Sequence, residues 1–178
     1  MRAGFIGLGA MGHPMAGHLA DRGLLAVVGN RTAAKAQAFA AARGVPAAVS
    51  FPDYAGCELV ALCVSADADV LENVDGLATV LAPGAIVIDH STVSVETARE
   101  VAKRLAARGI GFLDAPVSGG VEGAKNGRLS IMVGGDDATL ERARPALEAY
   151  AARIALIGPT GARHATTAVN QILVAGIN

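Results

Sequence analysis

A glycine-rich turn near the N-terminus constrains the fold of this chain more than any other feature of its sequence. The turn reads Gly7-Leu8-Gly9-Ala10-Met11-Gly12, and it follows an apolar run and opens a helical pattern. In this context one glycine permits the tight turn, one lets a ligand approach the backbone, and one allows close helix–strand packing. The free N–H groups and dipole of the following helix favour an anion. The pattern predicts a dinucleotide-binding Rossmann unit that grips a pyrophosphate, rather than a purely structural turn.

The rest of the chain alternates between short apolar runs and helical patterns, which is typical of βαβ units. Strands are predicted at Ala3–Leu8, Leu24–Val28, Leu59–Val64, Ile86–Asp89, Phe112–Leu113, Ser130–Val133 and Ile154–Leu156. Helices are predicted at Met11–Arg22, Ala33–Ala42, Val95–Arg108 and Ala138–Ala151, with a shorter one at Asp69–Val74. Right-handed crossovers place such helices on both faces of a sheet. We expect an α/β fold with a Rossmann-type, doubly wound, mostly parallel sheet over residues 1–161.

Polar residues mark several helix starts. Ser94 is expected to cap the helix that follows it, and Asp136 or Asp137 the last one. Asp67 and Asp69 follow a strand and precede a helical pattern, where acids favour the positive dipole end. We therefore expect a capping role for them rather than a paired-carboxylate site.

Composition narrows the class of partner. The 178 residues are 52% hydrophobic but only 3% aromatic, as expected for an aliphatic core beneath helices, and the net charge of −1 gives no reason to expect nucleic acid. We see no run long enough to span a membrane. Cys57 and Cys63 are not in a C-x-x-C pair, so we expect free thiols and a cytoplasmic protein. The four histidines show no zinc-site spacing, and no metal is predicted.

Residues 162–178 depart from this pattern. They predict a helix that is apolar on nearly all sides, and such a helix must be buried. We expect either that it starts an all-helical second domain that is missing from this sequence, or that it packs against another chain. A homo-oligomer is therefore expected.

The end of the second predicted strand bears on the choice of cofactor. The chain there reads Gly29-Asn30-Arg31-Thr32, without the carboxylate that NAD-preferring sites usually present to the ribose 2′-hydroxyl. Arg31 offers a planar cationic fork for a 2′-phosphate, with Asn30 and Thr32 as neutral donors. NADP(H) is therefore favoured over NAD(H), the alternative being that Arg31 is an ordinary solvated charge.

Several segments together resemble the β-hydroxyacid dehydrogenases, a family that includes 3-hydroxyisobutyrate dehydrogenase. These segments are Gly4–Ala20, Asn30–Thr32, Asp89–Thr92, Asp114–Gly120 and Leu129–Gly135. The resemblance implies hydride transfer between a nicotinamide and a small 3-hydroxy acid or its semialdehyde. It also implies that Ser118, Gly119 and Gly120 hold the substrate carboxylate, that Val64 and Ser65 lie beside the cofactor, and that Thr92 lies near the nicotinamide.

The family's acid/base lysine has no counterpart here. Relatives read approximately G-P-x-G-x-G-x-x-x-K-x-x-N, and counting back from Asn170 puts Thr167 at the lysine position. A threonine hydroxyl cannot take up a proton near neutral pH, and losing general acid–base help costs about 10²–10⁴ in rate. His164, about one turn away, is an alternative proton donor. We expect impaired catalysis by this chain alone, and a non-catalytic NADP(H)-binding or assembly module is the alternative function.

A hydrolase triad is rejected. Asp89, His90 and Ser91 contain the right residue types, but immediate neighbours in a chain point in different directions and cannot form the required relay.

Overall fold

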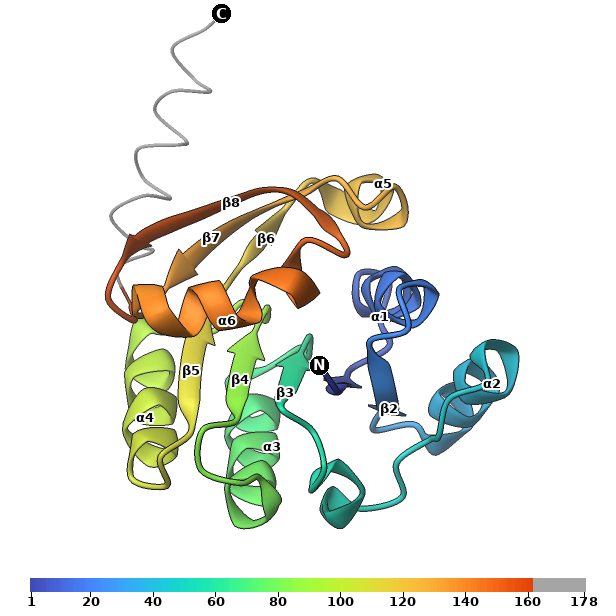
Figure 1. Cartoon of the computed structure of the whole chain (residues 1–178), viewed down its shortest axis with the longest axis horizontal. Coiled ribbons are helices and arrows are strands. Elements are labelled where there is room, and N and C mark those ends of the chain that lie inside the picture. The colour runs from blue at the N-terminus through green and yellow to red at the C-terminus, as the bar shows by residue number, and fades with distance from the viewer. Residues whose placement is uncertain (162–178) are drawn as a thin grey trace, which may run out of the picture.

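The computed structural model describes residues 1–161, which fold around one eight-stranded sheet (Figure 1). In chain order its strands are β1 (Ala3–Ile6), β2 (Leu25–Gly29), β3 (Leu59–Leu62), β4 (Ile86–Asp89), β5 (Gly111–Asp114), β6 (Val117–Ser118), β7 (Leu129–Gly134) and β8 (Ala151–Gly158). The spatial order is β2-β1-β3-β4-β5-β7-β6, with β8 paired to β7. The first five strands of the chain, β1 to β5, are parallel to one another, whereas β7 is antiparallel to both β5 and β6. The predicted mostly parallel α/β sheet is confirmed.

Helices follow most strands of this sheet. They are α1 (Gly12–Asp21), α2 (Ala33–Arg43), α3 (Asp67–Val80), α4 (Val95–Ala106), α5 (Gly120–Lys125) and α6 (Asp137–Leu147), with one 3₁₀ turn, η1 (Phe51–Tyr54). The chain places β2 on one side of β1 and then returns to place β3 on the other side. Open α/β sheets bind ligands at the carboxyl ends of the strands where the order reverses in this way. The fold therefore directs attention to the carboxyl ends of β1 and β3.

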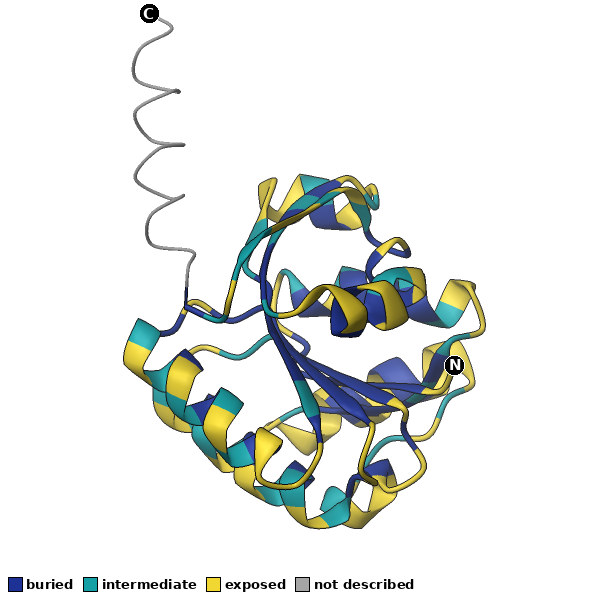
Figure 2. Ribbon diagram, turned by 60° about the vertical axis from the view of Figure 1, so that its left-hand side comes forward, coloured by how far each residue is buried: buried dark blue, intermediate teal, exposed yellow. Residues whose placement is uncertain are grey.

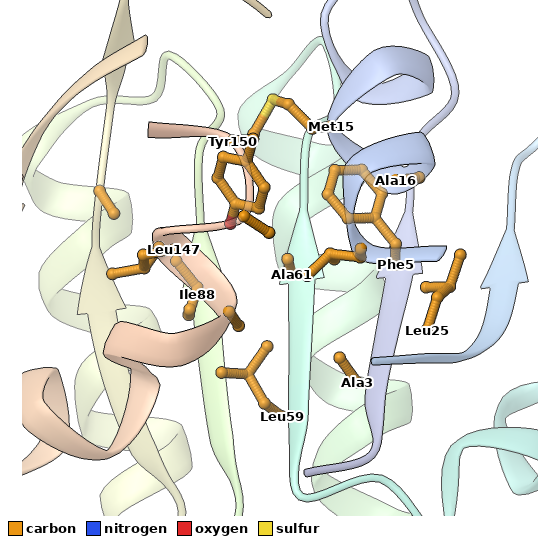
Figure 3. Packing of buried hydrophobic residues seen from close by; sticks show 14 of the residues in the cluster. Ala3, Phe5, Met15, Ala16, Leu25, Leu59, Ala61, Ile88, Leu147 and Tyr150 are labelled. Carbon is orange, nitrogen blue, oxygen red and sulfur yellow. The ribbon is translucent and has the colours of Figure 1, made fainter. Parts of the chain in front are cut away.

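Two hydrophobic cores cover the two faces of the sheet. Phe5 belongs to the core beneath α1, α2 and α6, whereas its neighbour Ile6 belongs to the core beneath α3 and α4. This alternation follows from the two-residue period of a strand. Figure 2 shows the sheet as a buried layer between partly exposed helices, and Figure 3 shows Phe5, Met15 and Tyr150 within the first core. The predicted covering of both faces by helices is confirmed.

The predicted caps are confirmed in part. The Ser94 hydroxyl accepts a hydrogen bond from the Thr97 N–H at 3.2 Å, and Asp136, rather than Asp137, accepts one from Thr139. Asp67 and Asp69 both lie in the first turn of α3, as expected, but the N-cap residue of α3 is Ala66. Their expected capping role is wrong, because both carboxylates bind side chains of other elements.

Helix α3, strand β6 and helix α5 are among the elements that differ from the sequence prediction. Helix α3 runs to Val80, beyond the predicted end at Val74. Gly76 lies inside this helix and does not end it. A Cβ there would lie 2.3 Å from the Phe51 ring, so the glycine permits packing by η1 rather than ending the helix. The two-residue strand β6 and the short helix α5 were not predicted, because neither is long enough to show a period.

Within the described residues, no further strand of the sheet pairs with the outer side of β2. The next stretch of chain meets β2 only through an isolated parallel bridge between Val28 and Ala47. Residues 45–50 therefore run beside the sheet as irregular chain before η1 begins.

Two sequence predictions concern other parts of the chain. The expected helix over residues 162–178, together with Thr167, Asn170 and His164, lies outside the described residues. Within residues 1–161 no helix is long and apolar enough to cross a bilayer. Cys57 and Cys63 are free thiols, as predicted.

Candidate functional site

The glycine turn lies at the carboxyl end of β1, between that strand and α1 (Figure 1). Two of its glycines are required by close packing. Gly7 has a φ of +104°, and a Cβ on it would lie 2.2 Å from the Cys63 carbonyl oxygen at the end of β3. A Cβ on Gly12 would lie 1.9 Å from the Gly7 carbonyl oxygen. No side chain fits at either position, so the fold itself demands glycine there.

Gly9 differs from both, because nothing in the described chain crowds it. A Cβ on Gly9 would meet no atom within 4 Å, and its φ lies outside the left-handed region. The residue is exposed at the start of α1. The fold therefore leaves open space beside this glycine, which is what a ligand approaching the backbone requires.

The N-terminus of α1 is suited to an anion. The His13 N–H donates to the Gly9 carbonyl at 3.0 Å, so the amides of Ala10, Met11 and Gly12 precede the first intrahelical donor. Within residues 1–161, α4 and α6 have side-chain caps, but α1 has neither a side-chain cap nor an acid in its first turn. A phosphate would satisfy these amides and the positive end of the helix dipole. The residues present fit a pyrophosphate.

Beside this turn a cleft of about 370 Å³ opens at the carboxyl ends of β1, β2 and β3. Its lining comes from these strand ends, from the irregular chain and η1 beyond β2, and from the first turns of α2 and α3. The residues are Ile6, Gly7, Gly9, Gly29, Asn30, Arg31, Thr32, Lys35, Ala48, Val49, Ser50, Phe51, Tyr54, Cys63, Val64, Ser65, Asp69, Glu72 and Asn73. The cleft thus lies at the switch point of the sheet.

Asn30 connects β2 to the glycine turn. Its Oδ1 accepts a hydrogen bond from the Leu8 N–H at 2.8 Å, and its Nδ2 donates to the Thr32 carbonyl at 3.1 Å. The side chain therefore fixes the turn relative to the strand end. The Leu8 amide thereby already has a partner within the chain.

Charged side chains gather in the part of the cleft next to the chain that follows β2. Arg31 and Lys35 supply two cationic groups, and Asp69 and Glu72 of α3 supply two carboxylates. The Arg31 Nη1 lies 3.2 Å from Asp69 Oδ1. This part of the cleft thus carries two cationic and two anionic side chains.

The floor of the cleft is apolar. Tyr54 is buried against β1 and β2, and a Cβ on Gly29 would lie 2.1 Å from the Tyr54 hydroxyl oxygen. Burial raises the pKa of the Tyr54 phenol and raises the pKa of the Cys63 thiol to about 11. Both groups stay protonated near neutral pH, so Cys63 is not an activated nucleophile.

The Asp89–Thr92 segment follows β4 and is held by hydrogen bonds. The Ser91 hydroxyl accepts from the Val64 N–H at 2.9 Å, which joins the ends of β3 and β4. His90 points to the Ala115 carbonyl and to Tyr150, at 2.6 Å and 2.8 Å, and not to Ser91. These partners rule out a serine relay through His90. Thr92, the last residue of this segment, is exposed and does not line the cleft.

Ser118, Gly119 and Gly120 follow β5 in the chain, where Ser118 ends β6, Gly119 connects the two elements and Gly120 begins α5. Gly119 and Gly120 have φ values of +128° and +60°, and all three residues are exposed. The His18 Nε2 of α1 lies 2.9 Å from the Ala124 carbonyl oxygen, so α5 packs against the helix that starts at the glycine turn. None of the three residues lines the cleft.

The structure brings seven of the predicted cofactor residues together in one cleft. They are Gly7, Gly9, Asn30, Arg31, Thr32, Val64 and Ser65, while Leu8, Ala10, Met11 and Gly12 complete the turn beside it. Sequence reasoning missed the apolar floor and the charges of Lys35, Asp69 and Glu72. Lys35 lies one turn into the helix after Thr32, which is a signal that could have been used. Within residues 1–161, no cluster of three metal-binding side chains occurs.

Comparison with known families gives one matching model. Residues 2–158 match the NAD-binding domain of 6-phosphogluconate dehydrogenase. The match covers the sheet from β1 to β8, so the cleft lies within it.

Individual proteins agree with this match. The chain is 40% identical over 176 residues to the NAD-dependent L-serine dehydrogenase of Pseudomonas aeruginosa, covering 96% of this chain and 58% of that protein. The solved 3-hydroxyisobutyrate dehydrogenase of Mycobacterium tuberculosis with L-serine superposes with a TM-score of 0.90 at 38% identity, covering 98% of this chain and 61% of that one. Psf3 in complex with NADP+ and 2-OPP gives 0.86 at 31%, covering 94% and 61%. The chain spans 58% to 62% of the curated relatives compared.

Proposed function

Because the chain belongs to the β-hydroxyacid dehydrogenase family, we propose that it binds NADP(H) in the cleft between β1, β2 and β3. In the whole protein this cofactor would carry hydride to or from a small 3-hydroxy acid or its semialdehyde, as in a 3-hydroxyisobutyrate dehydrogenase. The chain's own residues bind and orient both molecules. Gly9 is the observation that carries the proposal, since its missing side chain serves no packing need and leaves the anion-binding end of α1 open.

The preference for NADP(H) rests on the end of β2. No acid follows that strand, and the Arg31 side chain is 84% exposed at the mouth of the cleft. Arg31 would bind a 2′-phosphate as a charged fork, with Thr32 as a neutral donor and Lys35 as a second cation. NAD(H) lacks this phosphate and would gain nothing from either cation.

Substrate binding is assigned to the exposed Ser118–Gly120 segment. Its hydroxyl and backbone amides would hold a carboxylate, and two consecutive glycines with positive φ aim backbone amides in a way that suits an anion. Thr92 would lie at the nicotinamide end. A substrate alcohol between these groups would be shielded from water only once further protein covers this exposed surface.

By the same family resemblance, residues 1–161 form the dinucleotide-binding domain and residues 162–178 begin an interdomain helix of an all-helical domain. The relatives are longer than this chain, which supports that division. Such a protein would work as a cytoplasmic homo-oligomer.

Thr167 favours a second candidate, a non-catalytic NADP(H)-binding or assembly module. A threonine at the acid/base position cannot exchange a proton with the substrate oxygen near neutral pH. Asn170 would remain to hold the substrate by hydrogen bonds. Steady-state assays against 3-hydroxyisobutyrate, glycerate and serine separate the two candidates: turnover supports the dehydrogenase, and binding without turnover supports the module.

Isothermal titration calorimetry tests the cofactor proposal directly. The 178-residue chain is titrated with NADPH and NADH, and with adenosine as a control that lacks phosphates. We expect NADPH to bind most tightly and adenosine least. The proposal fails if neither dinucleotide binds below about millimolar concentration, the weak end of measurable affinity.

A further inference from the structure

The cation at the mouth of the cleft already has an anionic partner. Arg31 Nη1 lies 3.2 Å from Asp69 Oδ1 and 3.4 Å from Asp69 Oδ2, although the two residues are 38 positions apart in the chain. Arg31 comes from the end of β2 and Asp69 from the first turn of α3. The ion pair therefore spans the cleft from one wall to the other.

The two partners are held to different degrees. The Asp69 side chain is 24% exposed and lies within a helix turn, whereas the Arg31 side chain is 84% exposed. A long exposed side chain can change its partner at little cost, because exposed ion pairs contribute little. The carboxylate stays in the cleft wall whichever way Arg31 turns.

We propose that Asp69 is a specificity-determining residue, which competes with the 2′-phosphate of NADP(H) for Arg31 and so limits the preference for NADP(H) over NAD(H). This inference rests on the proposed cofactor function and deepens it.

The argument is electrostatic. A 2′-phosphate carries up to two negative charges, and binding it to Arg31 brings those charges close to the carboxylate that now pairs with Arg31. Arg31 must either leave Asp69 or hold both anions, and either outcome weakens the grip on the phosphate. NAD(H) has a hydroxyl at this position, so it meets no such repulsion. Asp69 therefore penalises one cofactor and not the other.

The test compares dissociation constants of NADPH and NADH for the full 178-residue chain and for Asp69→Asn, measured by calorimetry at low ionic strength. The amide keeps the shape of the side chain and removes its charge. We expect NADPH to bind about fivefold more tightly to the variant, the ratio that corresponds to the upper range for an exposed ion pair, with NADH unchanged. Thermal unfolding should be unaltered.

Two matched variants separate this effect from others. Asp75→Asn removes a carboxylate from the same helix that pairs with Arg104 at 2.9 Å outside the cleft, and it should leave both constants unchanged. Glu72→Gln removes a charge that lines the cleft without removing the partner of Arg31, so it should change the NADPH constant less than Asp69→Asn does.

The outcomes are distinct. If Asp69→Asn weakens NADPH, Asp69 positions Arg31 for the phosphate and the competition is refuted. An unchanged NADPH to NADH ratio, or an equal gain from Glu72→Gln, also refutes it. If neither dinucleotide binds the unmodified chain, the proposed function itself fails, which is a different result from a failed competition.

Discussion

The Nε2 atom of His90 lies 2.8 Å from the hydroxyl oxygen of Tyr150, and both side chains are buried. The Nδ1 atom of the same ring lies 2.6 Å from the Ala115 carbonyl oxygen, which can only accept a hydrogen bond. The proton of the neutral ring is therefore assigned to Nδ1, and the Tyr150 hydroxyl donates to Nε2. One imidazole thus joins the end of β4, the chain that follows β5 and the residue that precedes β8.

Lowering the pH is predicted to lower the free energy of unfolding because of His90. Burial lowers the pKa of His90 from 6.5 to about 4 in the folded chain. The unfolded chain therefore binds the extra proton first, so the His90 contribution is complete above pH 6.5 and is lost as pH falls toward 4. The loss should reach about 3 kcal/mol of unfolding free energy. Urea unfolding at several pH values measures it.

His90→Gln should flatten this pH dependence while lowering stability at pH 7. His13→Gln is the matched control, because His13 lies exposed on α1. An unfolding free energy that falls just as steeply in His90→Gln as in the natural chain would contradict the assignment.

Gly12 and Gly9 of the turn are predicted to respond differently to alanine. Gly12→Ala should lower the unfolding free energy by about 1–3 kcal/mol, since its Cβ would overlap the Gly7 carbonyl. Gly9→Ala should change stability by less than about 0.5 kcal/mol, because nothing lies near its Cβ. It should nevertheless weaken NADPH at least tenfold by calorimetry. Full NADPH affinity in Gly9→Ala would mean that the open space is not the phosphate site.

Arg31→Asp is predicted to weaken NADPH more than NADH. The change removes the exposed guanidinium and places a second carboxylate beside Asp69 at the mouth of the cleft. We expect the NADPH constant to rise by at least tenfold, which corresponds to about 1.4 kcal/mol, within the range for a lost charge-assisted hydrogen bond. Lys103→Asp on α4, outside the cleft, controls for net charge. Equal losses for both cofactors would remove Arg31 from the 2′-phosphate role.

Asp67 is predicted to stabilise the chain by tying α3 to α4. Its Oδ2 accepts from the Thr97 hydroxyl at 2.7 Å, the Ser94 hydroxyl at 2.8 Å and the Ser94 N–H at 3.0 Å. These bonds, chiefly those from Thr97 and Ser94 side chains, lower the pKa of Asp67 below 3.8. The contribution is therefore present above pH 3.8 and is lost as pH falls further.

Asp67→Ala should lower the melting temperature at pH 7, with a smaller difference from the natural chain in strong acid. Asp137→Ala removes an acid from the first turn of α6 and serves as the control. The link is refuted if both variants melt at the same temperature. Calorimetric scans at pH 7 and pH 3 make the comparison.

The sequence predicted the sheet well because its strands are short apolar runs between helical patterns. Leu59–Leu62 and Ile86–Ile88 are buried on both faces, so they appear as unbroken apolar runs. By contrast, β6 has two residues, one of them exposed, and carries no such pattern. Its position depends on β7, whose paired residues lie 12 and 14 positions away along the chain, which a local pattern cannot reveal.

The cleft was predicted in part for the same reason. Gly7, Gly9 and Arg31 were found because one short motif and the strand after it identify them. Asp69 was interpreted as a helix cap, since nothing local to it indicates that the first turn of α3 lies beside Arg31, which follows β2. Partners that meet only through the order of strands in the sheet lie beyond a local pattern.

The single bridge between Val28 and Ala47 has a consequence for how such a protein evolves. Because the chain beyond it carries no strand register, insertions or deletions there would leave every ladder of the sheet intact. That same stretch forms one side of the cleft. Natural selection could thus remodel the shape offered to a ligand at this side without rebuilding the scaffold that supports it.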